Sequence, residues 1–268
     1  MNSKRDQHFQ QEIIGLIPAG GQAKRISPLP FSKELYPIGF RLVDEERGMR
    51  PKVVCHYLLE KMRAGGITKA YIVLREGKWD IPAYFRDGAS LDMHLAYLIL
   101  GLPFGVPYTL DQAYPFVQQA LVAFGFPDIL FQPEDAFLKL LSGQAASNAD
   151  IVLGLFRADQ PNKVDMIDLD DKGRVRQVVI KPSQTQLRYT WGIAVWTPVF
   201  TNFLHEHLAT RKTSASTQPE LSVGDVVQAA IHKGLRVEGV HVSDEPYLDI
   251  GTSKDLAKAI TRFAVQAT

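Results

Sequence analysis

Short apolar runs alternate along the chain with segments in which apolar residues recur at helical spacing. The runs predict strands over residues 13–18, 70–74, 95–100, 121–124, 151–156, 164–170, 175–181, 191–197 and 236–242. The amphipathic segments predict helices over residues 51–65, 109–120, 134–142, 198–208, 222–233 and 253–266. Such alternation is typical of α/β proteins, and a single doubly wound sheet is the simplest arrangement. Ligands of such sheets bind outside the carboxyl ends of the strands, which is where we expect a site.

The sequence predicts a disordered N-terminal tail and no boundary between domains. Residues 1–11 are polar, mixed in charge and without the apolar stretch of a signal peptide, so we predict a disordered start. We find neither a repeat nor a low-complexity linker, and we expect residues 12–268 to form one domain. Asp171-Lys172-Gly173 predicts a hairpin turn. The small polar residues of 209–219 suit a mobile flap, although a passive surface loop fits them equally well.

The composition narrows the classes of partner and of chemistry. With 30 Lys and Arg against 29 Asp and Glu, the net charge of +1 gives no electrostatic reason to expect nucleic acid or a membrane as a partner. No run approaches the ~20 apolar residues of a membrane span, and we expect a cytoplasmic protein. The single cysteine, Cys55, excludes an internal disulfide and a thiolate metal cluster. It falls on the apolar face of a predicted helix, where we expect a buried structural thiol.

The segment over residues 13–38 carries the most specific chemical signal. A buried strand ends at Pro18-Ala19-Gly20-Gly21, and Lys24, Arg25 and then Lys33 follow. Adjacent glycines let the backbone approach a ligand closely. Exposed backbone N–H groups and converging cations form a site that suits a polyphosphate. An ordinary strand-to-helix turn with solvated cations is an equally good interpretation of the residues alone.

This segment resembles the signature of the sugar-1-phosphate nucleotidylyltransferases. That signature reads Ala-Gly-Gly-x-Gly-Thr-Arg-Leu-x-Pro and then Ser/Pro-Lys-x-Leu-x-Pro-Val. Residues 19–28 read Ala-Gly-Gly-Gln-Ala-Lys-Arg-Ile-Ser-Pro, and residues 32–38 read Ser-Lys-Glu-Leu-Tyr-Pro-Ile. The Ser-Lys form is most similar to the thymidylyltransferases that activate glucose 1-phosphate. Ala23 replaces a glycine of the pattern, which is costly if its φ is positive and tolerable if it is negative.

The resemblance covers about residues 13–262 and implies both a fold and a reaction. The implied fold is a Rossmann-like, doubly wound, mostly parallel mixed sheet of the nucleotide-diphospho-sugar transferase type. In the implied reaction a sugar 1-phosphate attacks the α-phosphorus of a nucleoside triphosphate, and pyrophosphate leaves. On the family's pattern, Arg25 and Lys33 act on the triphosphate. The backbone that binds the nucleotide is that of Ala19, Gly20 and Gly21.

Two carboxylates are candidate Mg²⁺ ligands. Asp128 follows a predicted strand and faces the phosphate loop, as a magnesium ligand would, although in isolation a turn residue is the commoner interpretation. Asp249 lies in Tyr-Leu-Asp-Ile-Gly-Thr over residues 247–252, which also fits an Asx-type turn. The two segments resemble the family's Gly-Asp-Asn/Ala-Leu/Ile-Phe/Tyr and Trp-Leu/Val-Asp-Ile/Thr-Gly-Thr motifs. The resemblance implies that both aspartates bind Mg²⁺, with Pro127 replacing the glycine of the first motif.

The remaining candidates concern the acceptor and the base. Lys181 resembles the lysine of the family's Glu-Lys-Pro, which grips the sugar phosphate, and an ordinary surface lysine is the alternative. Ile180 replaces the glutamate that reaches sugar hydroxyls. Because it cannot accept a hydrogen bond, we expect the usual hexose to bind more weakly by ~1–3 kcal/mol. Four more residues align with positions that contact base or sugar: Tyr108 with a base-reading glutamine, Asp165 with a sugar-contacting glycine, Gly192 and Glu220.

Two functions are compatible with these features. The retained cations and carboxylates favour an enzyme that couples a nucleoside triphosphate to a sugar 1-phosphate or related phosphate, with Mg²⁺ as cofactor. The altered glycine loop, Pro127 and Ile180 support a non-catalytic homologue that binds a nucleotide or nucleotide sugar and regulates a partner. The chain lacks G-x-x-x-x-G-K-[ST] and G-x-G-x-x-G, which removes the main support for a P-loop hydrolase or a dinucleotide oxidoreductase. The base, the acceptor and the existence of a homo-oligomer stay open.

Overall fold

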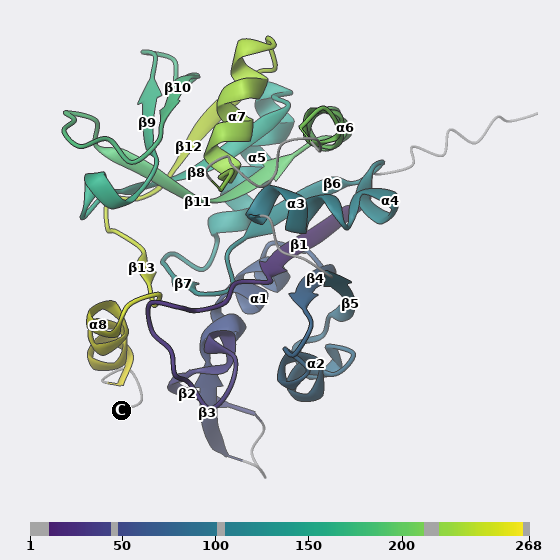
Figure 1. Ribbon diagram of the computed structural model, residues 1–268, viewed down its shortest axis with the longest axis vertical. Helices are drawn as coiled ribbons and strands as arrows, with labels where there is room; N and C mark the ends of the chain where they lie inside the picture. Colours follow the sequence, from purple (N-terminus) through teal and green to yellow (C-terminus); the bar gives the residue numbers. More distant parts are fainter. Residues whose placement is uncertain (1–10, 44–47, 101–104, 212–219, 265–268) are drawn as a thin grey trace, which may run out of the picture.

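One large sheet forms the centre of the molecule. The computed structural model describes residues 11–43, 48–100, 105–211 and 220–264. The strands of the sheet are β1 (Ile13–Ala19), β4 (Lys69–Arg75), β5 (His94–Leu100), β6 (Leu121–Gly125), β8 (Ile151–Arg157), β9 (Met166–Leu169), β10 (Val175–Val179), β11 (Tyr189–Trp196) and β12 (Val237–Ser243). Their order is β10-β9-β11-β6-β1-β4-β5, with β8 pairing with β11 and β12 beside β8 (Figure 1).

Most strands of this sheet run in one direction. The pairs β5–β4, β4–β1, β1–β6 and β8–β12 are parallel. The pairs of β11 with β6, β8 and β9, and of β10 with β9, are antiparallel. It follows that only β10 and β11 run against the other strands of the sheet. The predicted class, a Rossmann-like mixed sheet that is mostly parallel, is confirmed.

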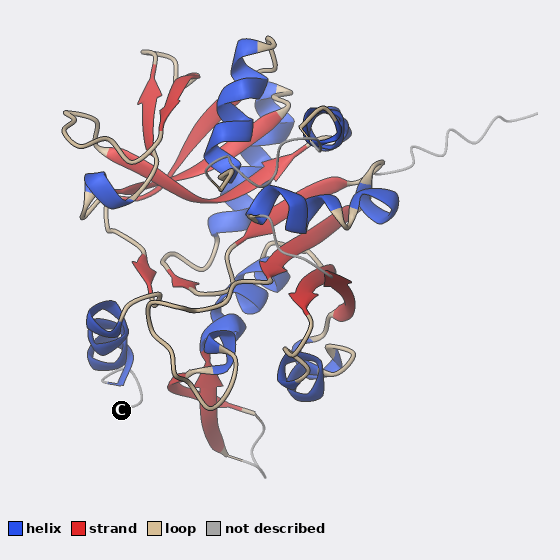
Figure 2. Cartoon of the chain, in the orientation of Figure 1, coloured by secondary structure: helices blue, strands red, loops and turns tan. Residues whose placement is uncertain are grey.

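Helices cover both faces of the sheet (Figure 2). One apolar cluster joins the sheet to α1 (Val54–Ala64), α2 (Asp80–Phe85) and α5 (Ala136–Ser147). The other joins it to α3 (Val106–Asp111), α4 (Tyr114–Val117), α6 (Pro198–Ala209) and α7 (Val223–His232). Along β1, Ile14 and Leu16 belong to the second cluster and Ile17 to the first. The strand is therefore buried on both faces, which explains its unbroken apolar run.

A smaller unit lies at the lower end of the molecule in Figure 1. It contains the hairpin of β2 (Pro37–Leu42) with β3 (Met49–Val53), the short pair β7 (Ile129–Leu130) with β13 (Leu248–Asp249), and α8 (Ser253–Ala264). A third apolar cluster holds it together, and Tyr57 of α1 packs there edge-on against Phe263 of α8 at 5.0 Å between ring centroids. Asp249 belongs to this unit, and the pairing of β13 with β7 connects it to the segment that follows β6.

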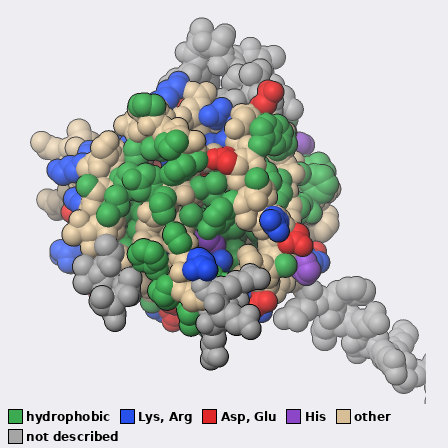
Figure 3. Space-filling view, turned by 90° about the horizontal axis from the view of Figure 1, so that it is seen from below, with side chains coloured by type: hydrophobic (Ala, Val, Ile, Leu, Met, Phe, Trp, Pro, Cys, Tyr) green, Lys and Arg blue, Asp and Glu red, His purple; other side chains and the backbone are tan. Residues whose placement is uncertain are grey.

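Apolar side chains are exposed on the β2–β3 hairpin. Phe40 is 52% exposed, Leu42 64% and Met49 49%. The space-filling view of this end of the molecule shows hydrophobic side chains gathered over much of the face (Figure 3). A patch of this kind suits contact with another molecule. Whether the chain forms a homo-oligomer, which the sequence leaves open, stays a prediction.

Three helix boundaries differ from the predictions. Residues 51–53 belong to β3, so the helix expected from 51 begins at Val54. The helix expected over 109–120 is two short helices, because Pro115 near the start of α4 cannot continue the hydrogen-bond ladder of α3. The helix expected to end at 142 runs on to Ser147 and stops at Asn148, which takes a left-handed φ of 51°.

Other predictions are confirmed or fall outside the described residues. The turn at 171–173 joins β9 to β10, with Gly173 at a φ of 84°. Most of the predicted tail, residues 212–219 of the predicted flap and the last two residues of the final predicted helix lie outside the described residues. The prediction of one domain over 12–268 stays a prediction. Of the helices described, none is both long and apolar enough to cross a membrane.

Candidate active site

The sheet divides at β11. Residues 193–196 of β11 pair with β6, whereas Tyr189 and Thr190 pair with the start of β9. Trp191 and Gly192 lie between these stretches and pair with neither strand in the described register. The end of β6 and the start of β9 therefore diverge from one shared strand. A cleft of about 660 Å³ opens there, beside the carboxyl ends of β1 and β6.

The two predicted metal ligands meet through the β7–β13 pair. Asp249 pairs with Ile129, and the backbone N–H of Ile250 donates to the carbonyl oxygen of Asp128 at 3.1 Å. Burial raises the pKa of the Asp249 carboxyl, and the charge of Asp128 raises it further. The N–H of Gly251 acts in the opposite direction, donating to Asp249 Oδ1 at 2.7 Å. A carboxylate whose ionisation is opposed by a neighbouring carboxylate favours a cation between the two.

Lys33 neutralises one of these carboxylates in the free protein. Its ammonium donates to Asp128 Oδ2 in an ion pair whose side chains are only 14% and 16% exposed. Burial alone would lower the pKa of Lys33, but Asp128, with Glu34 and Asp249, outweighs it and raises that pKa above its ordinary value. Lys33 is therefore a fixed positive charge inside the cleft.

Three further cations, Arg25, Lys163 and Lys181, line the cleft from opposite sides of the divided sheet. Arg25 lies in the loop after β1, with its Nη2 3.6 Å from Asp249 Oδ2. Lys181 lies just beyond β10 and takes a left-handed φ of 39°. A lysine seldom adopts that conformation, which costs of order 1 kcal/mol, and such strain is commonly found at functional sites. The cleft thus holds cations from both of its walls.

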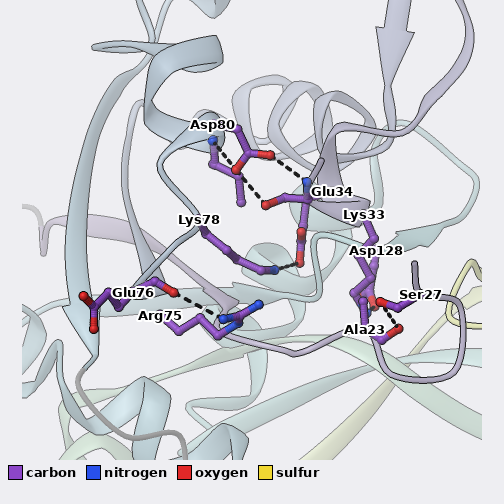
Figure 4. A network of polar contacts seen from close by, with 11 residues as sticks. Ala23, Ser27, Lys33, Glu34, Arg75, Glu76, Lys78, Asp80 and Asp128 are labelled. Atoms are coloured by element: carbon purple, nitrogen blue, oxygen red, sulfur yellow. Dashed lines mark hydrogen bonds and ion pairs between the residues drawn. The ribbon is translucent and has the colours of Figure 1, made fainter. Parts of the chain in front are cut away.

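The turn that carries Lys33 is anchored on both sides (Figure 4). On one side, the N–H and Oγ of Ser32 donate to the Asp80 carboxylate at 2.6 and 2.7 Å. On the other side, Lys78 Nζ donates to Glu34 Oε1 at 2.7 Å. Both anchors come from the segment that leads into α2, so this segment fixes Lys33 in the cleft.

The Glu34–Lys78 pair is almost completely buried. Their side chains are 2% and 5% exposed. Burial raises the pKa of the Glu34 carboxyl against the lowering effect of Lys78. Glu34 Oε2 is shielded from water and has no hydrogen-bond partner among the described residues. Glu34 also lines the cleft, so this buried ion pair reaches the candidate site itself.

The donor set of the cleft fits Mg²⁺ that arrives with a polyphosphate. Magnesium is held by one or two carboxylates together with phosphate oxygens and water. Asp128 and Asp249 supply two carboxylates, and within the described part of the chain no group of three or more His, Cys, Asp and Glu side chains could hold a metal ion. The remaining ligands would therefore come from the substrate and from water. Binding of Mg²⁺ itself is still a prediction.

A comparison with known families decides the assignment. A model of the nucleotidyl transferase family matches residues 14–265, from the first strand to the last helix. The chain belongs to the nucleotidyl transferase family. This match confirms the resemblance noted in the sequence and covers every residue predicted for the site of this nucleotidyl transferase.

Relatives and solved structures extend the comparison. The low-salt glycan biosynthesis nucleotidyltransferase of Haloferax volcanii is 23% identical over 254 residues, which are 91% of this chain and 64% of that protein. A glucose-1-phosphate thymidylyltransferase of Streptomyces griseus is 24% identical over 258 residues, 94% of this chain and 66% of that protein. The chain thus spans slightly less than two thirds of these relatives. The inositol-1-phosphate CTP transferase from T. maritima shares the fold, with a TM-score of 0.72 at 17% identity, covering 94% of this chain and 96% of that one.

The cleft of the nucleotidyl transferase brings together most residues predicted from the sequence. Those that line it are Gly20, Gly21, Arg25, Lys33, Asp128, Asp165, Lys181, Glu220 and Asp249. They come from strand ends and loops far apart in the chain. The roles assigned to them stay predictions, but the shared location that those roles require is present.

Four predicted residues do not line the cleft. Ala19 is buried at the end of β1, and Tyr108 lies partly buried in α3. Ile180 packs behind the cleft wall against Gly224, and a Cβ built on Gly192 would come within 2.8 Å of Ile129 Cδ1. Gly192 therefore lets β7 approach β11, which is a structural requirement of the site. The lining of the cleft therefore does not support direct contact between these four residues and a substrate.

The prediction from sequence missed several residues of the cleft. Glu34 stood inside the quoted motif, but nothing local shows that it is buried. Trp191, Phe126 and Thr109 also line the cleft. Trp191 precedes Gly192 in a segment that the resemblance had already marked, so an aromatic residue beside a glycine at that place was the available signal.

The glycine-to-alanine change in the phosphate loop proves to be strained. Ala23 takes a φ of 53°, and its carbonyl oxygen accepts the N–H groups of Ile26 and Ser27, each at 3.0 Å. A left-handed conformation costs a non-glycine residue roughly 1–2 kcal/mol. The φ of Ala23 is positive, which is the costly alternative stated in the sequence analysis.

We expect Ala23→Gly to raise the free energy of unfolding by about 0.5 kcal/mol, because the strain it relieves exceeds the entropy that glycine adds to the unfolded chain. Denaturant unfolding of both proteins measures the difference. Ala146→Gly, on the exposed face of α5, is the matched control and should lower stability by about 0.5–1 kcal/mol. A loss of stability in Ala23→Gly comparable to that of the control would contradict the prediction.

Proposed function

We propose that this nucleotidyl transferase joins a nucleoside triphosphate to the phosphate of a sugar 1-phosphate, or of a related phosphorylated acceptor, and releases pyrophosphate. One observation carries the proposal: a single cleft holds two neighbouring carboxylates and four cations, drawn from both sides of the divided sheet. Arg25 and Lys33 come from the segment after β1, whereas Lys163 precedes β9 and Lys181 follows β10. Two polyanions that enter from opposite sides would each meet fixed positive charge.

The chemistry requires positioned charge more than proton transfer. The reaction brings two polyanions together, so charge repulsion dominates the barrier. Arg25 and Lys33 bind the triphosphate and stabilise the charge of the departing pyrophosphate, while Lys181 orients the acceptor phosphate in line with the α-phosphorus. That phosphate is ionised at neutral pH, so no general base is needed. When bound, Mg²⁺ supplies further neutralisation of the phosphates from the carboxylates of Asp128 and Asp249.

The relatives differ in the molecules for which they are named. One is named for glucose 1-phosphate and thymidylyl transfer, and the solved structure for inositol 1-phosphate and CTP. Both acceptors are phosphorylated rings that carry several hydroxyl groups. We therefore place the acceptor of this chain in that class and leave the base to experiment.

The experiment is a screen for pyrophosphate release with Mg²⁺, pairing the four ribonucleoside triphosphates and dTTP with sugar 1-phosphates and other phosphorylated polyols. Release that needs one triphosphate and one acceptor together supports the proposal. In that reaction, Lys181→Ala should raise the KM for the acceptor at least tenfold and leave the KM for the triphosphate within about twofold. Lys172→Ala, exposed at the turn of the same hairpin, is the matched control. An unchanged acceptor KM in Lys181→Ala would contradict the role of Lys181.

One observation favours a second function, a non-catalytic homologue that binds a nucleotide or nucleotide sugar and regulates a partner. The strained Ala23 lies in the loop where the family has a permissive glycine. Metal dependence separates the two functions. Nucleotide binding that Mg²⁺ strengthens and Asp128→Asn weakens supports the enzyme, whereas metal-independent binding in the absence of turnover supports the regulator.

A further inference from the structure

Asp165 stands at the point where the sheet opens. It immediately precedes β9, and its carbonyl oxygen accepts a hydrogen bond from Thr190 Oγ1 of β11 at 2.8 Å. This bond fixes the backbone of Asp165 to the strand that both halves of the sheet share. Asp165 also lines the cleft, on the same wall as Lys181.

The carboxylate of Asp165 has an unused acceptor. Oδ1 is shielded from water and has no hydrogen-bond partner among the described residues. Burial raises the pKa of Asp165 to about 6, against the lowering effect of Lys181. A buried carboxylate oxygen without a donor destabilises the protein in which it occurs. Native structures retain such groups mainly where a ligand or another function requires them.

The surrounding residues are arranged to keep this carboxylate in place. A Cβ built on Gly224 of α7 would lie 2.3 Å from Asp165 Oδ2 and 2.9 Å from Ile180 Cδ1. The carboxylate and the Ile180 side chain therefore both occupy space that any other residue at 224 would fill. Gly224 lines the cleft as well. The glycine and the apolar wall together make a socket for the side chain of Asp165.

We propose that Asp165 accepts a hydrogen bond from a hydroxyl group of the acceptor whose phosphate Lys181 holds, and that this contact selects acceptors with a hydroxyl near the phosphate. The inference rests on the proposed function and names a specificity-determining residue for it. Lys181 is close enough to affect the ionisation of Asp165, and with Lys163 in the same lining it disfavours a further cation at that place. The donor is therefore a neutral hydroxyl and not an ammonium group. The structure also accounts for Ile180, which packs behind the cleft wall beside Gly224 while Asp165 supplies an acceptor group to the cleft.

The test compares wild type with Asp165→Ala and Asp165→Asn, using the triphosphate that supports release. The acceptors are glucose 1-phosphate, inositol 1-phosphate and their monodeoxy analogues. Asp165→Ala should raise the acceptor KM by 10- to 100-fold and leave the triphosphate KM unchanged. Removing the one hydroxyl that Asp165 contacts should raise the acceptor KM of the wild-type enzyme. It should not raise the acceptor KM of Asp165→Ala further, because the hydrogen bond is already absent from that variant. Asp168→Ala, on β9 outside the cleft lining, is the control.

Two further measurements separate recognition from structure. The melting temperature of Asp165→Asn should equal or exceed that of wild type, because a buried unpaired charge is removed. A merely structural aspartate would show the opposite. Gly224→Ala should displace the carboxylate without removing it and raise the acceptor KM in the same way.

The outcomes distinguish this inference from the reaction on which it rests. If Asp165→Ala keeps the wild-type acceptor KM and pyrophosphate release still needs an acceptor, the role of Asp165 is overturned and the proposed reaction stands. Equal weakening of every monodeoxy analogue in wild type and variant also overturns it. Absence of release from wild type with every pair overturns both the inference and the proposed function.

Discussion

Asp249→Ala is expected to lower Mg²⁺-dependent pyrophosphate release by about 10³-fold, since losing a metal ligand removes several kcal/mol of charge stabilisation at the transition state. The backbone pairing of β7 with β13 holds Asp249 beside Asp128, and Asp249 is the partner of Arg25. Its removal therefore weakens the proposed metal site and releases one of the cations. Steady-state rates across a Mg²⁺ titration measure the effect.

The companion variant and a control make this prediction specific. Asp128→Ala should lose activity to a similar extent, and the double variant should be little worse than either single one, because the two residues act as a unit. Asp244→Ala, on the exposed approach to the same strand, should keep wild-type activity. If both single variants release pyrophosphate with the wild-type dependence on Mg²⁺, the carboxylates are not metal ligands and the proposed chemistry fails.

Lys78→Met is expected to lower the free energy of unfolding by about 3–5 kcal/mol, because breaking a buried ion pair leaves an uncompensated charge. Glu34 has no other described donor, since its second carboxylate oxygen is already without a partner. Replacing both members, as in Glu34→Leu with Lys78→Met, should recover most of the loss. Denaturant unfolding at neutral pH measures both variants.

The loss in Lys78→Met should depend on pH in a defined direction. Burial already raises the pKa of Glu34 above its ordinary value of 4.5, and removal of Lys78 raises it further. Below about pH 4.5 the carboxyl is neutral in folded and unfolded protein, so the penalty is small. It grows as the pH rises from there through the folded-state pKa. Lys258→Met, whose ion pairs are 3.7 and 3.8 Å long and exposed, should cost less than about 0.5 kcal/mol at any pH. A comparable cost in both variants would refute the argument.

The core of the sheet was predictable because its strands are buried on both faces. The continuous apolar runs of β1, β6 and β8 predict strands buried on both faces, and nearly all residues of these strands are buried in the structure. The β2–β3 hairpin was missed because it does not belong to that core. β3 is exposed at three consecutive residues, 49–51, so it shows no alternation, and Gly39 interrupts β2 at a φ of 77°. Pro115 accounts for the break between α3 and α4, because it has no N–H to continue the helix.

For the site, the charged residues and their shared location were predictable, whereas the contacts that hold them there were not. Arg25, Lys33, Asp128, Lys181 and Asp249 all line one cleft, as their motifs implied. What brings the two aspartates together is a pairing of two residues each, which is too short to leave a pattern in the sequence.

The buried pair of Glu34 and Lys78 was equally hidden. Each residue is charged, and a charged residue is usually exposed, so neither segment indicates burial of these side chains by itself. Only the packing of the α2 segment against the turn of Lys33 shows that the two side chains meet. Long-range contacts between charged residues are the part of this site that local sequence could not specify.

The division of the sheet at β11 has a consequence for how such a protein can diversify. The residues proposed for the triphosphate follow β1, whereas Asp165 and Lys181 belong to the β9–β10 hairpin on the other side of the gap. The hairpin is joined to the rest of the sheet through β11, at Tyr189 and Thr190, and at its turn through the bridge of Arg174 to Glu238 of β12. Changes in the hairpin can therefore alter one half of the cleft without disturbing the backbone that shapes the other. Under the proposed function such a scaffold is modular, because remodelling the hairpin would change the acceptor while the residues proposed for the triphosphate stay in place.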